Sequence, residues 1–198
     1  MTKFEKMRIA LRYYYIGRRF DIASDALEYA PKYHQGTRKD GVTPEFFHQL
    51  QICSFIRTLE GGLLFPELTQ VAGLLHDTPE DNPDTVKHQY LTTRFGSEAG
   101  DAIWLLDKNG KDLATYHDQC ASNPISSIVK GVDGISNFGS MTEVYTKEKQ
   151  LVKIELLETK FLPMIKSARR NFPKQEAVYE NIKFQLEMQS KLLRVINK

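Results

Sequence analysis

The stretch "VAGLLHDTPEDN", from Val71 to Asn82, begins as the apolar face of a helix and ends in a cluster of acids. It places His76, Asp77, Glu80 and Asp81 directly after "GLL". A neutral imidazole and a carboxylate both bind divalent metals, and mixed nitrogen and oxygen ligands suit Mn²⁺, Fe²⁺ or Zn²⁺. The stretch therefore indicates either a metal site at the end of a buried helix or a helix end followed by a solvated acidic loop.

The composition is that of a globular chain with little net charge. Its 198 residues are 41% hydrophobic, and 27 Lys and Arg against 25 Asp and Glu leave a net charge of +2. This balance does not favour nucleic-acid binding, which needs a basic surface, although a small anionic ligand needs only a local basic pocket. No apolar run reaches the roughly 20 residues of a membrane span, and charges interrupt the first 20 residues, unlike a signal peptide.

Two cysteines, Cys53 and Cys120, form no disulfide framework or zinc pattern. Cys53 lies in an apolar helical run and is expected in the core. We therefore expect a soluble protein of a reducing, cytoplasmic compartment, without a nucleic-acid or membrane partner. The sequence leaves the oligomeric state open.

Helical periodicity runs through most of the chain, and strand signals are nearly absent, so the predicted class is all-α. The first two helices are predicted to divide near Gly17, and Pro44 and Pro66 to begin the next two. Ser97 is a candidate N-cap, and His34–Thr43 is a polar, glycine-bearing loop. Two long helices are predicted at about 144–171 and 174–196, the second packing back through Val178, Ile182, Leu186, Leu193 and Ile196.

Residues 125–138 predict another amphipathic helix. Lys130, Asp133 and Asn137 share its polar face by helical spacing, and Asp133 lies at the edge of the apolar stripe. A carboxylate at this edge can point into a partly buried site. His48 follows "EFF" in a separate apolar helix, a position where a lone histidine is usually a core residue.

Four segments carry a resemblance to a known family. "LLHDTPEDN" resembles the HDxxED signature of the HD-domain metal-dependent phosphohydrolases, and more narrowly the hydrolase domain of the RelA/SpoT family in its small single-domain form. "EYAPKYHQGTRKDG…FFH", "TTRFGSEAGDAI" and "SSIVKGVDGISNFGSM" are similar to three further motifs of that family, in the same order. The resemblance covers residues 20 to 170. It implies one HD-type helical bundle over 1–198, with its core at about 20–170 and a C-terminal helical extension at about 171–198.

The resemblance also implies a site, carried over position by position. The implied ligands of a divalent metal, typically Mn²⁺, are His48, His76, Asp77 and Asp133. The implied catalytic acids that orient and activate the attacking water are Glu80 and Asp81. The residues implied to bind the nucleotide are Arg38, Lys39, Lys130 and Asn137. His34 matches a motif histidine, for which we favour a supporting role over a ligand role.

The chain departs from the family pattern near the substrate. In "DGISN", Gly134 and Ser136 stand where the family has arginine and histidine, and Gly139 stands where arginine is common. These departures reduce the positive charge on this helix. "PEFF" replaces the usual tyrosine region before His48, and Pro79 replaces an aliphatic residue.

The implied activity is metal-dependent hydrolysis of a phosphorylated nucleotide, foremost removal of the 3′-diphosphate from guanosine 3′,5′-bis(diphosphate), (p)ppGpp. Two alternatives stay open. The same chemistry can act on the 2′-phosphate of NADPH or on a nucleoside monophosphate. The altered "DGISN" helix is also compatible with a non-catalytic nucleotide-binding module on an HD scaffold.

Overall fold

The computed structural model describes residues 1–38 and 40–197, and these residues form a bundle of helices. The first half contains α1 (Lys3–Arg18), α2 (Asp21–Tyr29), η1 (Ala30–Lys32), α3 (Phe47–Thr58), η2 (Glu60–Gly62), α4 (Pro66–Leu75), α5 (Thr78–Asp81), α6 (His88–Phe95) and α7 (Ser97–Leu106). The second half contains α8 (Tyr116–Ala121), α9 (Ser126–Gly139), α10 (Met141–Val144), α11 (Lys147–Leu156), η3 (Leu157–Phe161), α12 (Leu162–Asn171), η4 (Pro173–Gln175) and α13 (Glu176–Ile196). The all-α prediction is confirmed: within 1–38 and 40–197, extended pairing is limited to a single bridge between Thr37 and Pro44.

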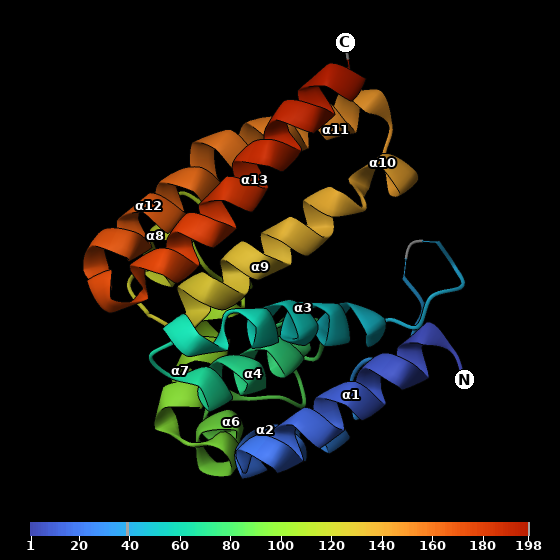
Figure 1. The fold of residues 1–198 in the computed structure, drawn as a ribbon, viewed down its shortest axis with the longest axis vertical. Helices are drawn as coiled ribbons and strands as arrows, with labels where there is room; N and C mark the ends of the chain where they lie inside the picture. The colour runs from blue at the N-terminus through green and yellow to red at the C-terminus, as the bar shows by residue number, and fades with distance from the viewer. Residues whose placement is uncertain (39, 198) are drawn as a thin grey trace.

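Helix α9 lies in the middle of the bundle. Figure 1 shows it between α1–α7 on one side and α11–α13 on the other, and it packs against α3 and α4 as well as against α13. The approach of the C-terminal helices is close at Gly131, where an added Cβ would stand 2.8 Å from side-chain atoms of Ile165 and Ile182. A glycine on this face of α9 therefore sets the distance between the two layers.

Buried apolar side chains form a core that extends from Leu11 on α1 to Leu193 on α13. Cys53 is fully buried in it as a free thiol, as predicted. The predicted packing face of α13 is confirmed for Val178, Ile182, Leu186 and Leu193, which are all buried. Ile196 is 56% exposed, contrary to the prediction: it lies on the same side of α13 as Val178 but is the last residue of the helix. The proposed division at residue 171 stays a prediction.

Helix boundaries follow some sequence signals and not others. Pro66 begins α4 as predicted, whereas Pro44 does not begin α3. The Pro44 carbonyl instead accepts a hydrogen bond from Phe47 N in the turn before the helix. Ser97 is the first residue of α7 rather than its N-cap, which is Gly96. The division predicted near Gly17 lies at Arg19 and Phe20: α1 ends at Arg18, and Arg19, with a φ of 56°, turns the chain before α2.

The predicted helix at 144–171 is present from Lys147 to Asn171 but contains an irregular segment. Leu157–Phe161 is π-helical, and regular α-helix flanks it on both sides. Leu157 and Phe161 are both buried, so the wider turn faces the interior. Such segments are frequent beside functional sites.

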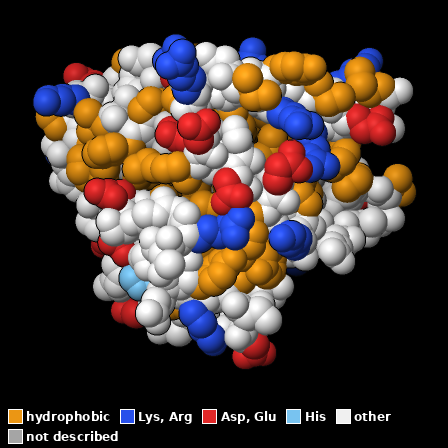
Figure 2. Space-filling model, turned by 90° about the horizontal axis from the view of Figure 1, so that it is seen from below, with side chains coloured by type: hydrophobic (Ala, Val, Ile, Leu, Met, Phe, Trp, Pro, Cys, Tyr) orange, Lys and Arg blue, Asp and Glu red, His pale blue; other side chains and the backbone are white. Residues whose placement is uncertain are grey.

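The surface carries no block of one charge on the face drawn in Figure 2, where acidic and basic side chains alternate with apolar patches. This pattern agrees with the net charge of +2. Among the helices of the described ranges, none is long and apolar enough to cross a membrane.

Candidate metal centre and cavity

The predicted metal ligands come from three helices whose apolar faces pack together. His48 lies in the first turn of α3, His76 directly follows α4, Asp77 precedes α5, and Asp133 lies on α9. Because α3, α4 and α9 contact one another through buried residues, these polar side chains meet at the edge of the core. The structure therefore brings together all four residues that the family resemblance selected.

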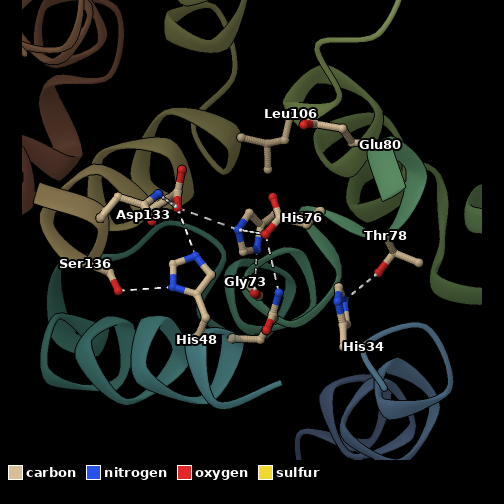
Figure 3. Close-up of polar contacts among 12 residues, drawn as sticks. His34, His48, Gly73, His76, Thr78, Glu80, Leu106, Asp133 and Ser136 are labelled. Atoms are coloured by element: carbon tan, nitrogen blue, oxygen red, sulfur yellow. Dashed lines mark hydrogen bonds and ion pairs between the residues drawn. The ribbon is translucent and has the colours of Figure 1, made fainter. Parts of the chain in front are cut away.

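His48 is held between two residues of α9. Its Nε2 lies 3.0 Å from Asp133 Oδ1, and its Nδ1 lies 3.1 Å from Ser136 Oγ (Figure 3). Only 5% of His48 is exposed, and its ring centroid lies 5.5 Å from that of His76. These contacts fix the plane of the ring and the direction of both nitrogens.

His76 directs a buried nitrogen toward the carboxylates. Its Nδ1–H donates to Gly73 O at 3.0 Å, which turns Nε2 toward Asp77 and Asp133. Nε2 is buried and has no hydrogen-bond partner among the described residues, although it lies 3.0 Å from Asp77 Oδ2 and 3.8 Å from Asp133 Oδ1. An imidazole whose other nitrogen is held by a backbone carbonyl is the usual geometry of a metal-binding histidine. The side chains present therefore fit a divalent cation.

The charges around His76 also favour a bound cation. Burial lowers the pKa of His76, but the Asp77 and Asp133 carboxylates outweigh it and raise this pKa to about 9. Burial alone would raise the pKa of Asp77, but the neighbouring His76 lowers the Asp77 pKa to about 2. The site thus stabilises positive charge beside Nε2. One ligand atom each from His48, His76 and Asp77 lies within 4.8 Å of the others.

Asp133 is stabilised as a carboxylate by its own helix. Only 5% of it is exposed, and it accepts hydrogen bonds from Lys130 Nζ at 3.1 Å and from Asn137 Nδ2 at 2.5 Å. Burial alone would raise the pKa of Asp133, but Lys130 and His48 hold it well below its usual range. The predicted shared face of Lys130, Asp133 and Asn137 is confirmed.

The two predicted catalytic acids point in different directions. Glu80 lines the cavity beside the candidate metal site of His48, His76, Asp77 and Asp133 and forms an ion pair with Lys108. Asp81 does not line this cavity and instead lies near His34 and Glu45. Partial burial and the neighbouring Asp77 and Glu45 carboxylates raise the pKa of Asp81 to about 6.

A cavity of about 740 Å³ opens beside this candidate metal site, within the usual size range of small-molecule sites. Its walls carry the cations Arg38, Lys108, Lys130, Lys153 and Lys160 and the aromatic residues Tyr116, Phe138, Tyr145 and Phe161. The combination of basic and aromatic walls suits a ligand with both phosphate and a ring. Arg38 and Asn137 line it as the predicted substrate-binding role requires, whereas Lys39 lies outside the described residues.

Several residues at the site were not selected from the sequence. Ser136 contacts His48, Gln49 Nε2 lies 3.4 Å from Asp77 Oδ2, and Lys108 pairs with Glu80. Ser136 stands three residues after Asp133 on α9, so helical spacing was a usable signal for it. Lys108 comes from the loop after α7, and nothing in its local sequence indicates this contact.

The structure gives a steric reason for one of the residues at which the sequence differs from the RelA/SpoT pattern. Gly134 faces Phe161, whose ring atoms would stand 2.7 and 2.8 Å from an added Cβ, so this position has no room for an arginine side chain. Gly139 faces Gln189 on α13. Positive charge reaches the cavity from other elements instead, through Lys108, Lys153 and Lys160.

Comparison with known proteins gives one informative similarity. The chain is 29% identical over 130 residues to a GTP pyrophosphokinase from Myxococcus xanthus. The aligned region covers 66% of this chain but spans only 13% of that protein. No family model matches the sequence.

Proposed function

We propose that the chain is a divalent-metal-dependent phosphohydrolase of a phosphorylated nucleotide, and that its substrate is (p)ppGpp, cleaved at the 3′-diphosphate. The observation that carries this proposal is the buried Nε2 of His76, directed at the Asp77 and Asp133 carboxylates, beside a cavity with basic and aromatic walls. Mn²⁺ is the cation that we assign to this centre. When bound, such a cation lowers the pKa of water toward neutrality and polarises a phosphoryl oxygen.

The similarity to a GTP pyrophosphokinase supports the choice of substrate class. Pyrophosphoryl transfer to a guanine nucleotide makes a pyrophosphate ester, and a hydrolase of that ester acts on the same kind of molecule. The similar region is a small part of that protein, so its activity is not carried over. The metal-ligating cluster favours hydrolysis, because it can supply activated water at neutral pH.

Each side chain then has an assignable task. The cation is held by His48, His76, Asp77 and Asp133. Lys130 forms an ion pair with Asp133 and partly neutralises its charge. Of the two acids, Glu80 lines the cavity, so we assign to it the orientation of the attacking water and acceptance of its proton. The corresponding role of Asp81 stays a prediction.

At the other end of the ligand, Arg38 is the residue assigned to the purine. Its planar guanidinium can stack on a base, which a lysine cannot do. Asn137 Nδ2 donates to Asp133 in this structure, and its remaining donor capacity and its carbonyl oxygen can reach the sugar. The lysines of the wall neutralise phosphate.

The test is hydrolysis by the purified, Mn²⁺-loaded protein of (p)ppGpp, NADPH and a nucleoside monophosphate, assayed side by side. We expect release of pyrophosphate from (p)ppGpp, and loss of that activity to background in Asp77→Ala with the fold retained by circular dichroism. Glu98→Gln serves as the control, because Glu98 is an exposed acid that does not line the cavity. Absence of turnover on every phosphorylated nucleotide would refute the proposal. Turnover of NADPH alone would refute (p)ppGpp as the substrate and leave the phosphohydrolase activity standing.

A further inference from the structure

A second group of metal-ligating side chains lies near the first. One ligand atom each from His34, Glu45 and Asp81 lies within 4.8 Å of the others. The three residues come from the loop after η1, from the turn before α3 and from the end of α5. We propose that His34, Glu45 and Asp81 form a second divalent-cation site, separate from the centre at His48 and His76.

The buried imidazole of His34 is the strongest observation. Only 4% of His34 is exposed, and its ring stacks on Phe46 with centroids 6.1 Å apart and planes at 17°. Its Nε2 lies 3.3 Å from Thr78 Oγ1, to one side of His76 in the view of Figure 3. Its Nδ1 is buried and has no hydrogen-bond partner among the described residues. When Nε2 donates to Thr78, Nδ1 keeps its lone pair, and a cation would give this nitrogen the partner that it lacks.

The two carboxylates also lack a balancing group. In the part of the chain that the structure describes, neither Glu45 nor Asp81 forms an ion pair or accepts a side-chain hydrogen bond. Two carboxylates this close repel each other, and a cation between them would relieve that repulsion. Their backbones are nevertheless fixed, because Glu45 N donates to Gly36 O and Asp81 N donates to Asp77 O, both at 2.9 Å. The backbone at both residues is therefore held in place, Glu45 is partly buried and Asp81 is exposed, and both carboxylates lie within reach of His34.

The ligand set defines the chemistry of the cation. One imidazole and two carboxylates suit Mn²⁺, Fe²⁺ or Zn²⁺, and three protein ligands leave positions open for water or for an anionic ligand. Glu45 also lines the cavity beside His76 and Asp77, so a cation held by it would stand at the wall of the same cavity. There it would add positive charge where a phosphate group can reach it.

Glu45 is also part of "PEFF", a segment in which the chain departs from the family pattern. The inference is independent of the proposed function, because cation binding requires no turnover.

The experiment counts Mn²⁺ bound to the metal-free protein by equilibrium dialysis and by electron paramagnetic resonance of the free ion. We expect two Mn²⁺ per wild-type chain and one in Glu45→Gln, which keeps the size of a partly exposed side chain and preserves the fold. His48→Ala should also retain one Mn²⁺, and the double variant none. Glu143→Gln, an acid of the same cavity outside both groups, should bind two.

A single Mn²⁺ in the wild type that Glu45→Gln leaves in place would overturn the inference. Two Mn²⁺ unaffected by Glu45→Gln would also overturn it, because the second cation would then lie elsewhere. His34→Ala tests the imidazole separately, with thermal unfolding as the check on its fold. These measurements use Mn²⁺ alone, so a protein that binds two cations but hydrolyses no nucleotide would sink the proposed function and leave the second site standing.

Discussion

Replacement of Gly134 by alanine should reveal how tightly Phe161 closes the cavity against α9. An added Cβ would stand 2.7 Å from Phe161 Cε1 and 2.8 Å from Cδ1, whereas carbon atoms in contact are about 3.5–4.0 Å apart. The ring cannot turn away freely, because it packs edge-on against Phe138 and His117 with centroids 5.2 and 5.0 Å away. Overpacking of this kind costs about 1–3 kcal/mol.

Alanine also has a higher helix propensity than glycine, by about 1 kcal/mol, which partly offsets the clash. We therefore expect Gly134→Ala to lower the free energy of unfolding by about 0–2 kcal/mol. Gly17→Ala is the matched control, because Gly17 is exposed in α1 and an added Cβ meets nothing within 4 Å. The difference between the two variants isolates the clash, and we expect about 1–3 kcal/mol by urea denaturation.

A second substitution separates steric overlap from other causes. In Gly134→Ala, the further change Phe161→Leu should relieve the overlap, so that the double variant loses less stability than the two single changes added together. The expected coupling is about 0.5–3 kcal/mol, the range for residues in contact. Equal stability of the two glycine variants, or strict additivity with Phe161→Leu, would refute the steric explanation for the missing arginine.

Three further predictions concern the cation, pH and the C-terminal packing. Ser136→Ala should weaken Mn²⁺ binding at the His48 centre about 10- to 100-fold by calorimetry, because it removes the contact that orients the ring, whereas Ser140→Ala should not. Burial lowers the pKa of His117 to about 4, below its ordinary 6.5, so the unfolded chain binds the proton more readily and stability falls as pH decreases from 6.5 toward 4. His117→Phe should reduce that loss by about 1–2 kcal/mol in urea titrations at pH 7 and pH 4.5, and an unchanged loss would contradict it. Glu158→Gln weakens the contacts of η3 with Ser190 and Arg194 on α13, so it should lower the melting temperature by a few degrees at low salt and by less at 1 M salt. A decrease that does not depend on salt would contradict the ionic explanation.

The fold was predictable where a local sequence pattern is compatible with only one structure. Apolar residues at helical spacing predicted α3, α9 and α13, because only one face of each helix can be buried. The prediction that Pro44 begins α3 was wrong, because proline fits a β-turn as well as the first turn of a helix. Which of the two forms depends on contacts with the preceding loop. The division near Gly17 was predicted to within two residues, but the left-handed residue that ends α1 is Arg19 rather than the glycine.

The candidate site was predictable only in part. Lys130, Asp133 and Asn137 followed from helical spacing, but the meeting of His48 with Asp133 joins residues 85 positions apart and came from the family resemblance. The ion pair between Glu80 and Lys108 depends on how the loop after α7 lies over α5, which no local pattern records. The different directions of Glu80 and Asp81 follow from the short α5, where neighbouring residues stand about 100° apart.

The π-helical segment Leu157–Phe161 has a consequence for how the cavity can change. Residues before its end, such as Lys153, Leu156 and Lys160, line the cavity, whereas Met164, Ile165 and Ala168 beyond it are buried in the core. A π segment accommodates one extra residue in an otherwise regular helix. Removal of one residue there would rotate the two parts by about 100° relative to each other and present different side chains to the ligand. Single-residue insertions and deletions in this turn are therefore a route by which such a scaffold can exchange one ligand for another while the core stays in place.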